Sequence, residues 1–187
     1  MCNYCGCRSI EPIAELTAEH EQVLNLRGDI RRAVRGGDFE QAVGLVRELR
    51  ELLLVHDAVE ELAVYPAMRR FEEFTDKVGT LFDEHDEMDD VMDGIVAAAD
   101  AGDDPAGMEW PRLLANLDVL AEHIDHEEHG MFPAAAVSLD PEDWERATAV
   151  RAEHSTSHLH SHPHGPGHSH GHEGSRPHEH AHSHAPA

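Results

Sequence analysis

Two stretches of the chain share one pattern of side chains. Residues 56–66 read HDAVEELAVYP, and residues 123–133 read HIDHEEHGMFP. Both fit the frame His-x3-Glu-Glu-x3-aromatic-Pro. On a helix, a histidine and a glutamate four positions later lie on the same face, one turn apart. Each stretch therefore presents an imidazole nitrogen and a carboxylate to a common point.

A second pair of matching stretches precedes the first. Glu19-His20-Glu21 lies upstream of one frame, and Glu84-His85-Asp86 lies upstream of the other. The chain is thus interpreted as two helical hairpins of similar design. This repeat suggests a pseudo-symmetric pair of metal half-sites.

Four long segments carry apolar residues at helical spacing, with charged residues on their opposite faces. Such helices, joined by short loops, predict an all-α protein that forms an antiparallel up-down four-helix bundle. A short fifth helix is expected from Asp140-Pro141 to about residue 153. The four main helices are expected from near Ser9 to Gly36-Gly37, from a cap at Asp38 to about Pro66 or slightly beyond, from Thr75-Asp76 to Ala101-Gly102, and from the loop ending at Gly107 to about Gly130.

Each predicted bundle helix places one histidine on its apolar stripe. Buried neutral imidazoles need polar partners, which a core of Leu, Val and Ile does not offer. Nitrogen and oxygen donors without thiolate suit iron or manganese, and facing helices in a bundle core can hold two such ions. The candidate ligands of this dinuclear site are His20, His56, Glu60, His85, His123 and Glu127.

At these positions the chain resembles the hemerythrin family, in particular bacterial hemerythrin-like proteins with an HHE cation-binding domain. Their pattern is His…His-x3-Glu…His…His-x3-Glu, and the resemblance covers about residues 10–135. It implies a four-helix bundle with an oxo- or hydroxo-bridged di-iron centre that reacts with dioxygen, peroxide or nitric oxide. It also implies that Glu60 and Glu127 bridge the metals and that the four histidines are terminal ligands.

The third predicted helix departs from the pattern of the oxygen carriers. A second histidine would fall four residues after His85, but position 89 is aspartate. The loss of this imidazole argues against reversible oxygen carriage. It favours redox turnover, peroxide chemistry, or sensing of nitric oxide or iron. Asp89 is itself a candidate ligand.

Some polar residues beside the candidate ligands fall off the ligand face. Glu61 and Glu128 lie about 100° round the helix from Glu60 and Glu127. The simpler interpretation is a solvated helix surface, and the alternative is support of a neighbouring ligand. The same two interpretations apply to His126 and His129. Tyr65 and Phe132 are expected in the core, with the prolines after them ending or kinking the helices.

The amino-acid composition excludes some classes of binding partner and indicates a cellular location. The formal net charge is −24, which argues against nucleic acid and anionic membranes because both carry the same sign. The sequence contains no apolar run long enough to cross a bilayer and no secretory signal pattern, so a cytoplasmic location is expected. The three cysteines lie too close together in the sequence to form disulfides that stabilise the fold. This cysteine pattern is more typical of a protein in a reducing compartment.

The two ends of the chain carry separate metal-binding signals. Residues 1–8 form an arm with Cys2, Cys5 and Cys7, one thiolate short of a four-sulfur site. Two interpretations of this arm are possible: it captures a metal or undergoes redox reactions, or it is an unstructured reactive segment. Twelve of the 18 histidines fall in residues 154–187, which are expected to be disordered. His-x-His pairs there favour nickel, zinc or copper, although a solvated tail with incidental affinity is the alternative.

The sequence therefore predicts three regions: the arm at 1–8, a hemerythrin-like bundle at 9–153 and the tail at 154–187. The leading hypothesis is a di-iron protein that binds or reduces a small oxidant, with peroxide or oxygen reduction as its candidate enzymatic activity. The alternative is a metal-homeostasis protein, in which the bundle senses or holds iron and the tail buffers nickel, zinc or copper.

Overall fold

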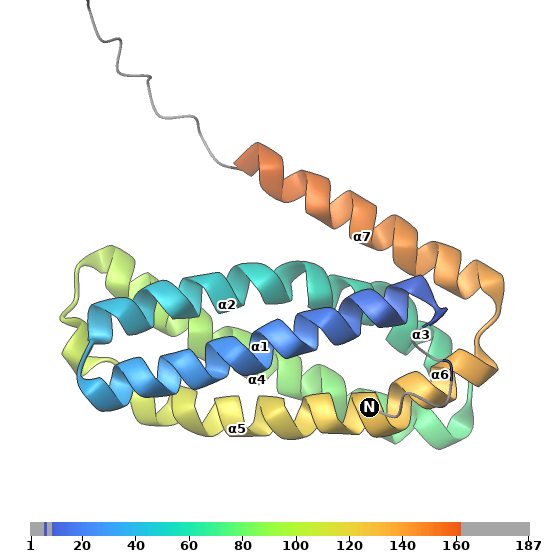
Figure 1. Cartoon of the computed structure of the whole chain (residues 1–187), viewed down its shortest axis with the longest axis horizontal. Helices are drawn as coiled ribbons and strands as arrows, with labels where there is room; N and C mark the ends of the chain where they lie inside the picture. Colours follow the sequence, from blue (N-terminus) through green and yellow to red (C-terminus); the bar gives the residue numbers. More distant parts are fainter. Residues whose placement is uncertain (1–5, 7–8, 162–187) are drawn as a thin grey trace, which may run out of the picture.

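The computed structural model describes residue 6 and residues 9–161, and the regular structure in this part of the chain is entirely helical (Figure 1). Four long helices form an up-down bundle in which α1 contacts α2 and α5, and α4 contacts the same two helices. The predicted all-α fold class is confirmed. The bundle helices are α1 (Glu11–Gly36), α2 (Phe39–Val59), α4 (Thr75–Ala101) and α5 (Trp110–His126).

Local sequence sets the turns between these helices. Gly37 and Gly102 follow α1 and α4 in the left-handed conformation, with φ of 75° and 82°, which glycine adopts without steric cost. The Asp38 side chain accepts a hydrogen bond from the Gln41 N–H, so it caps α2 as predicted. Short 3-10 turns precede the other two bundle helices, η3 (Glu72–Phe74) before α4 and η4 (Pro105–Gly107) before α5.

Helices α2 and α5 each continue into a π-helical turn. η2 (Glu60–Val64) leads into α3 (Tyr65–Met68), and η5 (Glu127–Met131) leads into α6 (Phe132–Ser138). The helix expected to end near Gly130 therefore runs on to Ser138, and that prediction is wrong. Each π turn is followed by a proline in the first turn of the next α segment, and this proline has no N–H to donate to a carbonyl of the preceding turn.

The last described helix is longer than predicted. α7 spans Pro141–Ser161 and continues eight residues past the expected end at 153, so the proposed boundary at 154 lies inside it. The stretch contains no glycine or proline between Pro141 and Pro163 to stop the helix. α7 lies across the outside of the bundle, against α2, η2 and α1 (Figure 1). Residues 162–187 and the three cysteines lie outside the described residues.

The bundle interior holds two apolar clusters with a polar layer between them. Val23, Leu53 and Met88 belong to one cluster, at the end that contains the α1–α2 turn. Ile13 and Val59 belong to the other, with the two π turns and α7. Along each bundle helix, the predicted histidine falls near the change from one cluster to the other. The polar layer is therefore enclosed by apolar side chains on both sides.

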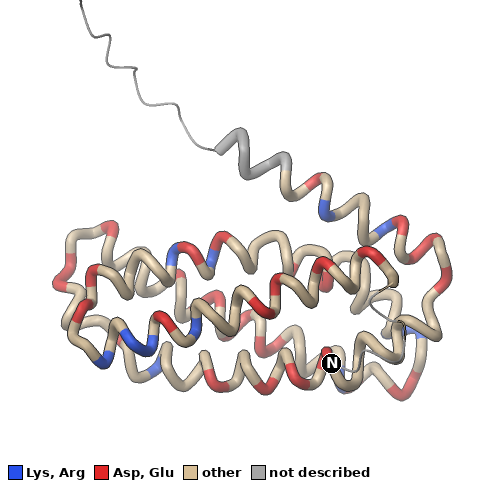
Figure 2. Tube along the Cα trace, in the orientation of Figure 1, with Lys and Arg blue, Asp and Glu red and all other residues tan. Residues whose placement is uncertain are grey.

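The outer surface is strongly acidic. Figure 2 shows aspartate and glutamate on all the bundle helices, with fewer lysines and arginines. Among the described residues, no helix combines the length and the apolar character that a membrane span requires.

Candidate metal centre

The six predicted ligands come together in the polar layer. All are buried, and Glu60 and Glu127 have no exposed surface. They form two overlapping groups of atoms that could each hold a metal ion, with the ligand atoms of each group within 4.8 Å of one another. The first group is His20, His56, Glu60 and Glu127, and the second is Glu60, His85 and His123.

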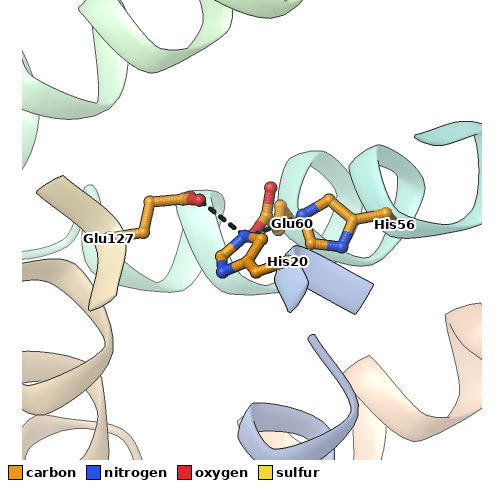
Figure 3. Close-up of side chains that lie close together, drawn as sticks. All are labelled: His20, His56, Glu60 and Glu127. Atoms are coloured by element: carbon orange, nitrogen blue, oxygen red, sulfur yellow. Dashed lines mark ion pairs between the residues drawn. The ribbon is translucent and has the colours of Figure 1, made fainter. Parts of the chain in front are cut away.

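The first group gathers side chains from α1, α2 and the two π turns. Figure 3 shows its two imidazoles and two carboxylates pointing toward one another. His20 Nε2 lies 3.2 Å from Glu127 Oε2, and His56 Nε2 lies 3.4 Å from Glu60 Oε1. The His56–Glu60 contact is the i, i+4 pair that the sequence predicts.

The second group uses the other oxygen of Glu60. His85 Nε2 lies 3.5 Å from Glu60 Oε2 and 3.1 Å from His123 Nε2. His123 Nε2 also lies 3.3 Å from Glu127 Oε2. The two glutamates therefore stand between the two pairs of histidines, where a carboxylate can contact both groups at once.

Every one of the four histidines is held by a glutamate at its other ring nitrogen. Each Nδ1 lies within hydrogen-bond distance of a carboxylate on a neighbouring helix, and each Nε2 is directed into the centre. A ring that donates from Nδ1 and carries no second proton offers the lone pair of Nε2 to a cation. The four pairs are His20 with Glu128 at 2.9 Å, His56 with Glu19 at 3.0 Å, His85 with Glu61 at 2.9 Å, and His123 with Glu84 at 2.8 Å.

These pairs close a ring around the bundle. α1 supplies Glu19 to the histidine of α2, and η2 supplies Glu61 to the histidine of α4. α4 supplies Glu84 to α5, and η5 supplies Glu128 back to α1. The interpretation of Glu61 and Glu128 as solvated surface is thus wrong, and the alternative, support of a neighbouring ligand, is what the structure has. Sequence reasoning missed Glu19 and Glu84, although the repeated Glu-His pair was a signal for them.

The centre contains buried polar atoms that no protein group satisfies. His20 Nε2, Glu60 Oε1 and Glu127 Oε2 are buried and have no hydrogen-bond partner. Such atoms are costly unless a cation or a donor meets them. Together with the donor chemistry of imidazole and carboxylate, these atoms fit a pair of metal ions.

The charges of the centre are strongly coupled. Burial, and then the neighbouring Glu127, raises the pKa of Glu60 well above its usual value. Burial acts in the same direction on Glu127, but His123 and His20 outweigh it and lower its pKa. Burial lowers the pKa of His56 to about 4, so this imidazole is neutral and ready to bind a cation. Burial lowers the pKa of His123, but the Glu127 and Glu84 carboxylates together outweigh burial and raise this pKa to about 10.

Two residues that the sequence did not single out as polar partners also reach the centre. Tyr65 is buried as expected, but its hydroxyl lies 2.5 Å from Glu127 Oε1 and 3.2 Å from Glu60 Oε2. Asp57 lies on α2 with its side chain 13% exposed, and its Oδ1 is 3.8 Å from His85 Nε2. Burial raises the pKa of Asp57 to about 7. The repeat did not mark either residue as a polar partner, because the equivalents of Tyr65 and Asp57 are phenylalanine and isoleucine.

The remaining candidates lie on the surface. Asp89 is exposed and belongs to neither group of ligand atoms. His126 and His129 are exposed too, and the Nδ1 of His129 lies 3.0 Å from the Asp125 carboxylate one turn earlier. These two histidines therefore have the solvated role that the simpler interpretation gave them.

A four-helix bundle that buries two adjoining groups of histidine and carboxylate around a shared glutamate has the architecture of a metal-binding bundle. The family model of the hemerythrin HHE cation binding domain matches residues 11–135, which agrees with this architecture. The chain belongs to this family and is a metal-binding protein. Comparison with curated proteins and with solved structures gives no match.

Proposed function

We propose that this protein holds a dinuclear iron centre and uses it to bind or reduce a small oxidant, namely dioxygen, peroxide or nitric oxide. The observation that carries the proposal is the pair of ligand groups that share Glu60, each with imidazole Nε2 atoms directed inward. Such a pair suits two cations a few ångströms apart better than one. Family membership makes iron the first metal to test.

The ligands of the proposed centre divide into two roles. Glu60 and Glu127 would bridge the two ions, because each lies within 3.5 Å of one imidazole from each helical hairpin. Glu60 contacts His56 and His85, and Glu127 contacts His20 and His123. His20 and His56 would complete one coordination shell, and His85 and His123 the other. When bound, iron supplies one-electron redox chemistry and positions for a small ligand.

The rest of the chain would prepare the site for this chemistry. The two apolar clusters exclude bulk water from both ends of the polar layer, which strengthens electrostatic interactions inside it. The Tyr65 hydroxyl donates a hydrogen bond to Glu127 and holds a proton next to the centre. Asp89 is not assigned as a ligand, because its side chain is exposed.

A second candidate function rests on the histidine-rich end of the chain. Twelve histidines follow or lie within the last turns of α7, a helix that packs against the π turn carrying Glu60. His-x-His pairs can chelate nickel, zinc or copper. In this candidate function the bundle holds or senses iron, and the tail buffers the other metals.

The experiment is anaerobic loading of the full chain with ferrous iron, followed by metal analysis and optical spectroscopy. We expect about two iron atoms per chain, and a spectral change on exposure to dioxygen, peroxide or nitric oxide. A matched chain that ends at Ser161, which keeps all described helices, should hold the same iron. Iron that disappears with the tail would contradict the proposed centre. An oxidant-insensitive iron centre would leave only the metal-holding function.

A further inference from the structure

The two helical hairpins of the repeat are covered differently. In the first hairpin, α7 lies against α1, α2 and η2 (Figure 1), and its Arg151 contacts Glu15 on α1. Ala147 and Val150 of α7 belong to the same apolar cluster as Val59. The equivalent groove of the second hairpin lies between the start of α4 and the end of α5 with η5. In the part of the chain that the structure describes, this groove holds a surface cavity of about 430 Å³.

The open groove is more polar than the covered one. The repeat pairs Val59 with His126, Leu62 with His129, and Pro12 with Lys77. Val59 is fully buried, whereas the two histidines and the lysine are exposed. A permanently packed helix would bury these polar groups, which is costly unless each finds a partner. The second groove therefore suits a dissociable polar ligand better than a helix of the same chain.

The cavity combines an apolar floor with an unpaired cation at its rim. Leu81 and Met131 are buried core residues, and Phe74 lies in the wall. Lys77 is the only lysine of the chain, and its Nζ lies 5.5 Å from the centroid of the Phe74 ring. Among the described residues, no ion pair joins Lys77 to a carboxylate. A few polar groups over an apolar lining are typical of sites for small organic molecules.

The negative charge in the cavity wall already has a partner. Asp125 is the one carboxylate among the described lining residues, and its Oδ1 lies 3.0 Å from His129 Nδ1. The exposed His126 ring lines the same wall. Lys77 and the imidazoles therefore offer N–H donors to an anionic group, on a chain whose net charge of −24 otherwise repels anions.

Gly130 keeps the cavity open. Its equivalent in the first hairpin is Ala63, which is buried. A side-chain carbon added at Gly130 would meet no atom within 4 Å, so close packing does not require a glycine here. Glycine within helical structure is also less stable than alanine. The space beside Gly130 leaves room for a flat ring against the π turn.

We propose that this cavity binds a small aromatic acid. Its ring lies on the apolar floor, where it stacks on Phe74 and contacts the Met131 thioether. Its carboxylate binds Lys77 and the exposed imidazoles. Leu81 lies one turn before His85, so the floor separates this ligand from the metal centre. The ligand therefore binds with or without metal in the bundle core.

The probe is anilinonaphthalene sulfonate, an aromatic anion whose fluorescence rises in an apolar site. Phenylnaphthylamine has the same rings without the sulfonate and is the neutral reference. We expect the full chain to bind about one anionic probe, at least about threefold more tightly than the neutral one. Naphthoate, an aromatic carboxylate, should displace it. Lys77→Met should remove the preference for the anion and still bind the neutral probe.

Two glycine substitutions locate the site. Gly130→Leu fills the cavity and should abolish binding of both probes. Gly94→Leu is the matched control, because it adds the same side chain to the exposed face of α4, where an added carbon also meets nothing within 4 Å. Gly94 lines a different cavity, of about 510 Å³, at the other end of α4. Gly94→Leu should bind both probes like the parent.

Each contrary outcome overturns a stated part of the proposal. Equal affinities for the two probes, or an unchanged preference in Lys77→Met, would overturn the recognition of an anion. Binding that survives Gly130→Leu, or is lost in Gly94→Leu, would overturn the location. Thermal unfolding checks the fold, and Gly130→Leu should unfold no lower than the parent, because it replaces a helical glycine in open space. If it unfolds early, the exposed Lys77→Met still decides.

Discussion

At the scale of single residues, the centre depends on which nitrogen of each histidine carries the proton. A glutamate at Nδ1 fixes both the tautomer and the ring orientation, and it raises the basicity of the nitrogen that faces the metal. Glu128 and Glu19 are the more buried members of this set, with side chains 9% and 15% exposed. Their carboxylates are therefore the least screened by water.

Replacement of Glu128 tests this orienting role. Glu128→Ala removes the acceptor of His20 and should weaken metal binding by about 10- to 100-fold. Glu128→Gln keeps an acceptor oxygen but loses the charge, so it should have a smaller effect. Glu122→Gln, on the exposed face of α5, is the control. Metal affinity is measured by Co²⁺ titration, and parent-like affinity in Glu128→Ala would argue against the role.

Replacement of a proposed ligand should cost metal and stability together. His123→Ala removes an inward nitrogen, whereas His129→Ala removes an exposed one on the same run of helix. Metal that binds only the folded state stabilises it by about 4 kcal/mol at a thousandfold excess over its dissociation constant. His123→Ala should lose most of this stabilisation in thermal unfolding with iron, and His129→Ala should keep it. Equal losses in the two variants would reject the assignment of faces.

At the scale of elements, the two π turns belong to the site as well as to the fold. Each begins at a glutamate of the centre, and each carries the glutamate that contacts a histidine on a neighbouring bundle helix. Consecutive residues on a helix point in different directions, so two adjacent glutamates can face two different neighbours. Glu60 faces the centre, and Glu61 faces His85.

Helix α7 also reaches the centre, through Glu19 on α1, one of the four glutamates that contact the histidines. The Arg151 guanidinium contacts Glu19 through both Nη atoms, with Nη2 3.0 Å from Oε2, and its Nε lies 2.9 Å from Glu15. Glu19 in turn holds His56. Ala147 and Val150 on the same helix are buried in the apolar cluster beside the π turns. Docking of α7 therefore supports a ligand as well as the core.

Removal of α7 should weaken both stability and metal binding. A chain that ends at Asp140 exposes part of the apolar cluster and frees Glu19 from Arg151, whereas a chain that ends at Ser161 keeps both contacts. The single substitution Arg151→Met isolates the polar contact and should lower the free energy of unfolding by about 1–3 kcal/mol. Chemical denaturation and Co²⁺ titration measure the two effects. If the chain ending at Asp140 had the same free energy of unfolding and the same metal affinity as the chain ending at Ser161, α7 would contribute to neither the core nor the centre.

At the scale of the whole molecule, an acidic bundle carries a histidine-rich extension. The net charge of −24 is counted with histidines neutral, so it becomes less negative as they protonate. The acidic surface shown in Figure 2 attracts cations without selecting among them. Selection must come from ligand geometry in the bundle and from imidazole pairs in the extension.

The extension should bind metals independently of the bundle. Compared with the chain ending at Ser161, the full chain should take up several further equivalents of nickel, zinc or copper, each bound weakly. This binding should fall away below about pH 6, because protonated imidazole cannot coordinate a metal. Isothermal titration calorimetry at two pH values measures it. Equal uptake by the two chains at neutral pH would leave residues 162–187 without a metal-binding role.

Local periodicity in the sequence was enough to predict the helices, the inward faces and the six candidate ligands. His56 and Glu60 share a face because they are four residues apart on one helix, and no neighbour is needed to establish that. The same reasoning applies to His20 and His85, which continue the apolar stripes of their own helices. The helix cap at Asp38 and the turn at Gly37 likewise depend only on residues nearby in the sequence.

Contacts between helices were decided only by the tertiary structure. Spacing along one helix does not say which neighbour lies beside Glu61, how deeply Asp57 is buried, or that Asp89 stays exposed. These outcomes depend on how each helix is rotated when its apolar stripe packs against three others, and residues at the edge of the stripe turn inward or outward with small rotations. For the same reason, the continuation of α5 into a π turn that contains Gly130 could not be predicted from the turn signals of glycine and proline alone.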